Sequence, residues 1–231
     1  MSWRKWVLSV TAVSVLVAMA ITLGCARRGP AKPRLTTWRP ASLAVLPYSE
    51  VLPTSGNATM ARSPLTFAVY TSGHIKPNAV AVLNDALMTL LPRVAKVRLV
   101  TGPKVGIAAG RVMGRGLYVN RRQALAALGR KLKVDGVMVG YVYRFQDREG
   151  GRLAVSRAAS VAFDLAVVRS SDGAVVWKNS FDQTQQPLSD NLMRLGDYAR
   201  HGIHWLTADE FGRFGLQQLL RDFPWRKKTS K

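Results

Sequence analysis

The sequence has little cysteine, little histidine and few acidic residues. Its only cysteine is Cys25, so an internal disulfide is impossible. Thirteen Asp and Glu stand against 34 Lys and Arg, which gives a formal net charge of +21. A protein surface this basic attracts anions of every kind, including phospholipid head groups, anionic polysaccharide and nucleic acid. The charge therefore predicts an anionic partner without selecting one.

The sequence also lacks the motifs of the common enzyme classes. It contains no G-x-S-x-G nucleophile elbow, no Gly-Lys-Ser/Thr phosphate loop and no G-x-G-x-x-G dinucleotide string. His201 and His204 form the only close histidine pair, and a metal site would need further ligands beside them. Because Trp205 follows directly, we interpret the pair as structural or surface residues. We therefore expect a non-enzymatic protein that holds no metal and no cofactor.

Residues 1–24 have the parts of a secretory signal. Arg4 and Lys5 form a basic end, and the apolar residues 7–23 after them carry no charge. Because the basic end precedes the apolar run, the rest of the chain is expected outside the cytoplasm.

Cys25 ends a string, ITLGC, that resembles a bacterial lipobox, with Thr22 where that pattern has Leu. The resemblance implies that the Cys25 thiol receives diacylglycerol, that the chain is cleaved before it, and that the acyl chains enter a lipid bilayer. Cleavage would remove Arg4 and Lys5, leaving 32 basic residues against 13 acidic ones and a formal charge of +19. The alternatives are an uncleaved membrane-spanning anchor and a plain cleaved signal. Ala26 stands where enteric inner-membrane lipoproteins have Asp, which favours the periplasmic face of the outer membrane.

Residues 25–41 are predicted to form an extended tether. Prolines and like charges along this segment oppose compact structure. They are Pro30, Pro33 and Pro40 with Arg27, Arg28, Lys32, Arg34 and Arg39. These basic side chains suit contact with anionic lipid head groups as well as with solvent.

Residues 42–225 are predicted to fold as one α/β domain of the α+β type, followed by a basic tail at 226–231. Apolar periodicity gives the order β(β)αβαβββα, a mixed sheet with helices packed on it. Strands are expected at 43–48, 65–70, 97–100, 137–145, 161–167 and 175–181, and helices at 77–91, 121–132 and 207–220. Thr207 and Glu210 form a capping box at the start of the last helix.

The segment 160–167 alternates between apolar residues and small or polar ones, which predicts a strand with one face in solvent. Asp164 lies on the polar side. We interpret it as a solvent-facing residue rather than an acid catalyst. Asp172-Gly173 then predicts the turn of a hairpin.

Three short strings resemble a family of bacterial envelope domains. They are Leu43-Ala-Val-Leu-Pro-Tyr48, the helix and strand at 125–141, and Asp172-Gly-Ala-Val-Val-Trp177. The family includes the curli-secretion lipoprotein CsgG, the amino-terminal domain of TolB and the penicillin-binding-protein activator LpoB. The resemblance covers residues 43–181 and implies the fold, whereas residues 181–225 depart from these members.

Five glycines between positions 102 and 116 predict a flexible loop after the strand at 97–100. Lys104, Arg111 and Arg115 make this loop basic, and they are the candidate contacts for an anion or a partner. The other basic clusters lack the interleaved aromatic residues of a nucleic-acid site, and export removes that ligand. No nucleic-acid partner is expected.

Together these features predict a membrane-anchored lipoprotein of the bacterial envelope that acts in the periplasm as a non-enzymatic binding or assembly module. Its sheet edge or basic loop would bind another envelope component, either a protein or an anionic polysaccharide. The alternatives are a periplasmic hydrolase with an unrecognised site and a subunit of an oligomeric secretion assembly. The sequence leaves the oligomeric state open.

Overall fold

Two long, buried segments, residues 136–146 and 160–169, pair in the middle of a mixed sheet. The computed structural model describes residues 38–53, 59–113, 120–151, 154–186 and 205–227, which belong to the compact unit Thr36–Lys231. The sheet has six strands in the order β10-β9-β6-β1-β5, with β2 also paired to β6. Their bounds are β1 Ser42–Val45, β2 Ser49–Glu50, β5 Arg98–Val100, β6 Gly136–Gln146, β9 Ser160–Arg169 and β10 Val175–Thr184.

The sheet joins a parallel half to an antiparallel half. β1 lies parallel to both β5 and β6, whereas β9 runs antiparallel to β6 and to β10. The hairpin between β9 and β10 turns at Asp172-Gly173, where Gly173 has a φ of +77°, a value that glycine adopts without strain. The hairpin predicted from Asp172-Gly173 is confirmed.

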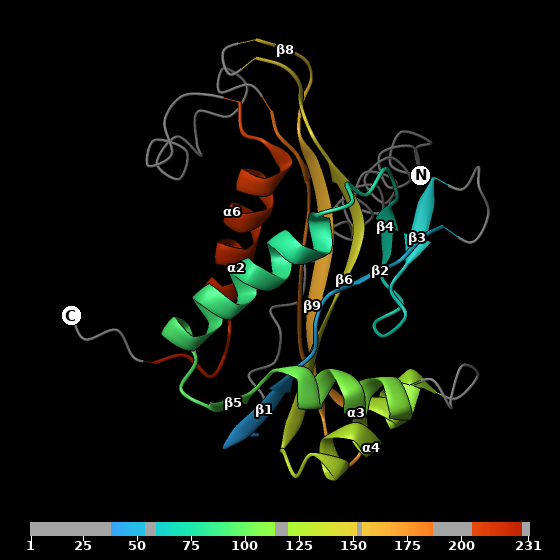
Figure 1. Ribbon diagram of the computed structural model, residues 1–231, viewed down its shortest axis with the longest axis vertical. Helices are drawn as coiled ribbons and strands as arrows, with labels where there is room; N and C mark the ends of the chain where they lie inside the picture. Colours follow the sequence, from blue (N-terminus) through green and yellow to red (C-terminus); the bar gives the residue numbers. More distant parts are fainter. Residues whose placement is uncertain (1–37, 54–58, 114–119, 152–153, 187–204, 228–231) are drawn as a thin grey trace, which may run out of the picture. The chain divides into compact units, whose positions relative to one another are not determined.

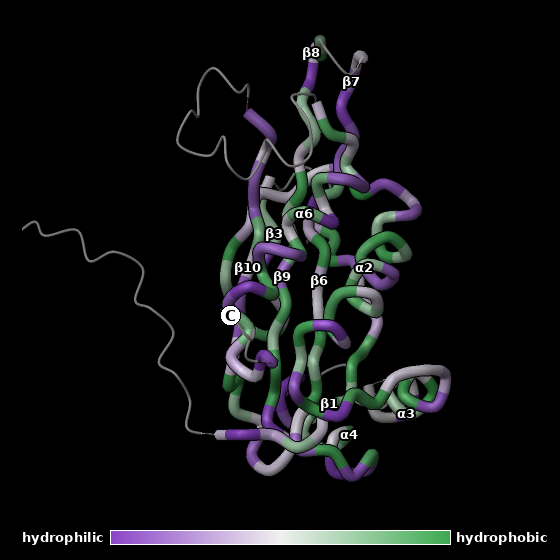
Figure 2. Tube along the Cα trace, turned by 90° about the vertical axis from the view of Figure 1, so that its left-hand side faces the viewer, coloured by the Kyte–Doolittle hydropathy of each residue, from purple (hydrophilic) through white to green (hydrophobic). Residues whose placement is uncertain are grey.

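Helices cover both faces of the sheet (Figure 1). One face packs against α2 (Ala79–Val94) and α6 (Ala208–Arg221), and we name it the α2–α6 face. The other packs against α3 (Pro103–Met113), α4 (Arg121–Lys131) and the hairpin of β3 (Met60–Arg62) and β4 (Val69–Thr71), and we name it the hairpin face. Figure 2 shows hydrophobic residues along β6 and β9, between these layers. The remaining strands, β7 (Glu149–Gly150) and β8 (Val155–Arg157), pair with each other.

Aromatic rings fill the α2–α6 face where α6 meets β9 and β10. The ring of Phe181 lies 5.7 Å from Phe163, 5.2 Å from Phe211 and 6.4 Å from Phe214, measured between centroids. The pairs with Phe211 and Phe214 are edge-to-face, a geometry that adds to the stabilisation that apolar burial provides. Gly215 makes this packing close, because a Cβ there would lie 2.6 Å from the Phe181 ring.

The start of β1 is held from two sides. The Asp135 carboxylate accepts hydrogen bonds from the backbone N–H groups of Ala41 and Ser42, at 2.8 and 2.9 Å. Trp38, just before the strand, packs edge-to-face on Trp225 with a centroid distance of 5.2 Å, and the Trp225 indole donates to the Trp38 carbonyl. The entry to β1 is therefore connected both to the start of β6 and to the C-terminal segment.

The capping box predicted at Thr207 and Glu210 is confirmed. The Thr207 hydroxyl accepts a bond from the Glu210 N–H at 3.2 Å, and the Glu210 carboxylate accepts one from the Thr207 N–H at 2.8 Å. The helix that follows them buries one apolar side on the sheet. The predicted fold class, a mixed sheet with packed helices, is confirmed, and four helices lie among the described residues.

The prediction that β9 has a solvent face was wrong. Both faces of this strand are buried, and Asp164 is only 3% exposed. Its polar side is covered by the β3–β4 hairpin, whose Ala61 and Tyr70 pack into the same cluster as Ala162 and Ala166. No strand was predicted at residues 60–62, which form β3, so nothing in the local pattern indicated this cover.

The prediction of a flexible, glycine-rich loop after β5 was also wrong, because residues 103–113 form the helix α3. Gly102, with a φ of +96°, directly precedes the helix, and Pro103 is well suited to a first helical position. Each glycine inside a helix costs up to about 1 kcal/mol. Burial of Val105 and Ala108 against α4 and the sheet offsets that cost. The helix α2 likewise continues two residues past Pro92, where it was expected to end.

Candidate binding groove at the sheet edge

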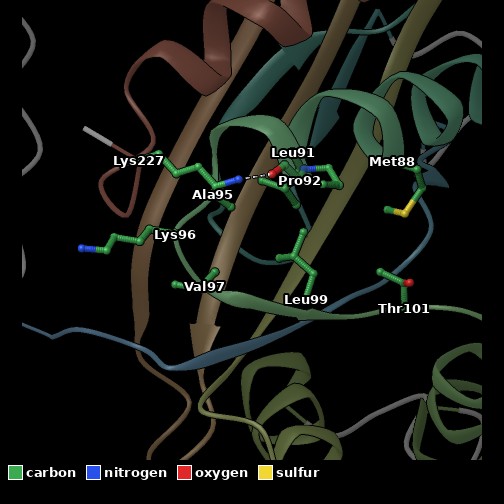
Figure 3. Close-up of a pocket in the computed structure, with 9 residues that line it drawn as sticks. All are labelled: Met88, Leu91, Pro92, Ala95, Lys96, Val97, Leu99, Thr101 and Lys227. Atoms are coloured by element: carbon green, nitrogen blue, oxygen red, sulfur yellow. Dashed lines mark hydrogen bonds between the residues drawn. The ribbon is translucent and has the colours of Figure 1, made fainter. Parts of the chain in front are cut away.

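A groove of about 780 Å³ lies where α2 passes over the edge strand β5. It is lined by Met88, Leu91, Pro92, Ala95, Lys96, Val97, Leu99, Thr101 and Lys227. Figure 3 shows Met88 and Thr101 at one end and the two lysines at the other. Most of the lining is apolar, and Met88 is 39% exposed. The groove is thus an apolar channel with cationic side chains at one end.

The floor of the groove is an open sheet edge. β5 pairs with β1 alone among the described strands, and the Arg98 N–H donates to the Ala41 carbonyl on that side. Alternate residues of a parallel strand bond to the same neighbour. The N–H and C=O of Leu99 therefore point to the open side. An edge with unpaired backbone groups is a template for a further strand.

The wall of the groove contains a second open backbone group. Pro92 lies inside α2 and has no N–H, so the helical bond to the Met88 carbonyl is not formed. The Pro92 carbonyl itself accepts a bond from the Lys227 ammonium at 2.9 Å, which is drawn in Figure 3. Lys227 is placed by backbone pairing, since its N–H donates to the Val94 carbonyl at 2.7 Å. The C-terminal segment thus builds the cationic end of the groove.

The chain that runs from the groove wall through β5 to α4 carries charge of one sign over a long stretch. Between Asp85 and Asp135 the sequence has no acidic residue and eleven basic ones. They are Arg93, Lys96, Arg98, Lys104, Arg111, Arg115, Arg121, Arg122, Arg130, Lys131 and Lys133. This stretch forms the second half of α2, then β5, α3 and α4. The edge of the sheet and the helices that follow it are therefore suited to an acidic partner.

The structure brings two of the three predicted contact residues onto one helix. Lys104 and Arg111 are exposed on α3, and their separation of seven residues puts them on the same side, about 10 Å apart along the axis. Exposed Ile107 lies between them. Arg115 lies outside the described residues, as does Cys25.

The histidine pair at 201 and 204 also lies outside the described residues. Within the part of the chain that the structure describes, no group of three or more His, Cys, Asp or Glu side chains could hold a metal ion. No helix among those residues combines the length and apolar character needed to cross a bilayer.

Sequence reasoning predicted a sheet edge as a binding element but did not locate the groove. Its lining comes from α2, from β5 and from the last described residue, Lys227, which lies more than 120 positions later in the chain. Pro92, within the apolar stripe of α2, was the signal of this groove that the sequence offered. A proline there implies that the backbone carbonyl four residues earlier, at Met88, has no helical partner.

No protein-family model matches the sequence, and no curated protein matches it. The chain is similar to solved structures of bacterial proteins. A PelC dodecamer from Paraburkholderia phytofirmans is 14% identical; the match covers 87% of this chain and 94% of that chain, with a TM-score of 0.44. Lipoprotein GNA1162 from Neisseria meningitidis is 13% identical over 70% of this chain and 97% of that chain, with a TM-score of 0.40.

The LpoB C-terminal domain from Escherichia coli is 14% identical, over 65% of this chain and 87% of that chain, with a TM-score of 0.35. LpoB is one of the proteins that the sequence strings resemble. Because all three TM-scores lie below 0.5, the function of this chain has to be argued from its own residues.

Proposed function

We propose that this chain is a lipoprotein of the bacterial envelope, anchored through Cys25, that binds an extended acidic segment of a partner protein in the groove beside β5. The module acts by binding rather than by catalysis. One observation carries the proposal: an open strand edge, an apolar groove and the basic side chains of Lys96 and Lys227 coincide at one place. A segment added to β5 would gain backbone bonds from Leu99, pockets for alternate side chains and ion pairs with the lysines.

The same features favour a partner protein over a second copy of the chain. Two copies paired edge to edge would bring Lys96 and Arg98 of each β5 segment together, and like charges across a sheet edge oppose pairing. They also favour a polypeptide over an anionic polysaccharide, because a polysaccharide does not present the alternating backbone donors and acceptors that a strand edge requires. Lys104 and Arg111 on α3 extend the cationic surface for acidic residues beyond the groove.

The anchor gives the first prediction. Replacing Cys25 by alanine should move the protein from the membrane fraction to the soluble fraction, or leave it as an uncleaved precursor, because no thiol remains to accept acyl chains. Mass spectrometry of the N-terminal peptide should show an acylated Cys25 in the unchanged protein. Ser14→Ala, within the apolar segment, is the matched control and should change neither location nor processing. A native protein that begins at Met1 with an unmodified thiol would remove the anchor from the proposal.

The groove gives the second prediction. A photo-crosslinking residue at Thr101, in the full chain expressed in bacteria, should attach to one partner, and the attached peptide should come from an acidic, extended segment. The same residue at Val69, exposed on the hairpin face, should not capture that partner. A synthetic peptide of the segment should then bind the purified full chain in detergent micelles.

Two variants of Leu99 distinguish the contribution of its backbone N–H to peptide binding from the contribution of its side chain. Leu99→Pro removes the outward N–H while keeping the bonds to β1, and it should weaken peptide binding about tenfold. Leu99→Ala keeps the N–H and should weaken binding less. Circular dichroism of both variants checks the fold. Attachment at Thr101 to another copy of this chain, or to a basic or carbohydrate partner, would refute the proposed occupant while leaving the anchor untouched.

A further inference from the structure

The hairpin face contains a second site, built around a carboxylate with one unsatisfied oxygen. Asp164 Oδ2 accepts hydrogen bonds from the hydroxyls of Ser63 and Tyr143, both at 2.8 Å. Oδ1 is equally buried and accepts no hydrogen bond from the described residues. A buried charged oxygen without a donor costs free energy. Asp164 is therefore able to accept a donor from a bound molecule.

A cavity of about 180 Å³ lies against Asp164. It is lined by Thr66, Ala68, Tyr70, Asp164, Lys178, Asn179 and Ser180. This volume is several times the share of one water molecule in the liquid, about 30 Å³. It suits a small organic molecule of a few heavy atoms.

β10 supplies the opposite wall of this cavity with two polar side chains. Ser180 pairs with Asp164 in the ladder, and side chains that are paired in this way lie on the same face. Lys178 is two residues away on that face, and its positive charge acts on the Asp164 carboxylate in the direction opposite to burial, which is the larger effect and raises the pKa of Asp164. None of the ion pairs among the described residues includes Lys178. The cavity therefore has a buried anion inside and an exposed cation at its mouth.

The rim of the cavity is held in a strained conformation. Phe67, between Thr66 and Ala68, has a φ of +60° and is 61% exposed. Such a backbone conformation costs about 1 kcal/mol or more for a residue other than glycine, and it is common at ligand sites. Arg122 of α4 holds the rim by two bonds to the Leu65 carbonyl, at 3.2 and 3.1 Å, and by stacking on Phe67. The rim is thus fixed before any ligand arrives.

We propose that this cavity binds a small free α-amino acid, with its ammonium group on Asp164 Oδ1 and its carboxylate toward Lys178. A simple anion would meet the Asp164 charge, and an apolar molecule would leave Oδ1 unsatisfied. A simple amine would satisfy Asp164 but leave Lys178 unmatched. A zwitterion satisfies both, and a cavity of about 180 Å³ suits the smaller amino acids.

The test is calorimetric titration of the purified full chain in detergent micelles with glycine, L-alanine and D-alanine, compared with ethylamine and propionate. The amino acids should bind, ethylamine should bind more weakly, and propionate should not bind. Asp164→Asn should weaken alanine binding at least about tenfold, the loss of one charge-assisted hydrogen bond. Asp172→Asn, at an exposed carboxylate on the β9–β10 turn, is the matched control and should leave the affinity unchanged.

Lys178→Met tests recognition of the ligand carboxylate separately from recognition of its ammonium group. It should weaken alanine binding and leave ethylamine binding unchanged. Thermal unfolding of each variant confirms that it is folded before titration. Absence of amino-acid binding at millimolar concentration, equal affinity in Asp164→Asn, or ethylamine binding as tight as that of alanine would each overturn the proposal.

Discussion

Replacing Phe181 by alanine should lower the free energy of unfolding by about 4 kcal/mol, the middle of the range for truncating a buried phenylalanine. Phe181 is 3% exposed and contacts rings from both β9 and α6. Its removal would leave a cavity that Gly215, directly against the ring, cannot fill. Urea unfolding of the full chain in detergent micelles, followed by tryptophan fluorescence, measures the change.

Phe67 provides the matched control for this truncation. It is the same residue type but 61% exposed, so Phe67→Ala should change stability by no more than about 0.5 kcal/mol. A small effect at Phe181, or equal effects at the two positions, would contradict the packing of α6 on β10.

Replacing Asp164 by asparagine should raise the stability at pH 7.5 by about 2 kcal/mol. Burial raises the pKa of Asp164 to about 6, from an ordinary 3.8, although the bonds from Ser63 and Tyr143 act in the opposite direction. The folded state thus holds a proton more tightly than the unfolded state between pH 4 and 6. The resulting stabilisation is present below pH 4 and is lost as the pH rises through 6. A shift of about two pKa units corresponds to at most about 3 kcal/mol.

The pH dependence of the free energy of unfolding shows whether the ionisation of Asp164 causes this difference in stability. The tyrosines near Asp164 are Tyr48, Tyr70, Tyr141 and Tyr143. Burial raises the pKa of each of them, that of Tyr70 to about 12, so all four keep their protons between pH 4 and 7.5. The difference between Asp164→Asn and the unchanged protein should therefore shrink as the pH falls from 7.5 to 4.5. A difference that does not change with pH, or a loss of stability at pH 7.5, would contradict the raised pKa.

A carboxylate that destabilises the fold at neutral pH is consistent with a binding role. Its removal would raise stability and weaken amino-acid binding in the same variant, which is the trade-off expected when a site is kept ready for a ligand. Stability and affinity can both be measured on Asp164→Asn, and they should change in opposite directions.

The sequence predicted those elements whose signal is local. The capping box at Thr207 and the turn at Asp172-Gly173 involve residues within four positions of one another, and both are confirmed. The long apolar run at 137–145 could form little other than a buried central strand. The register and order of the strands were not predicted, since they depend on pairings such as Leu43 with Gly136, far apart in the chain.

The errors arose where packing between distant segments decided the outcome. Alternation along β9 predicted a solvent face because the sequence does not show that residues 60–71 would cover it. Glycines predicted a loop at 103–113 because the burial of Val105 and Ala108 against α4 becomes available only in the folded unit. The groove is non-local in the same way, as α2, β5 and Lys227 meet only through the sheet.

The position of β1 has a mechanical consequence. β1 lies between β5 and β6 and is the first strand after the N-terminal segment, so tension on that segment pulls along the axis of β1. Its ladder bonds to both neighbours run across that axis and would be loaded together in shear, rather than opened one after another. The Asp135 bonds and the Trp38–Trp225 contact lie at the point where the load enters. A domain pulled by its N-terminus would therefore resist extension at β1.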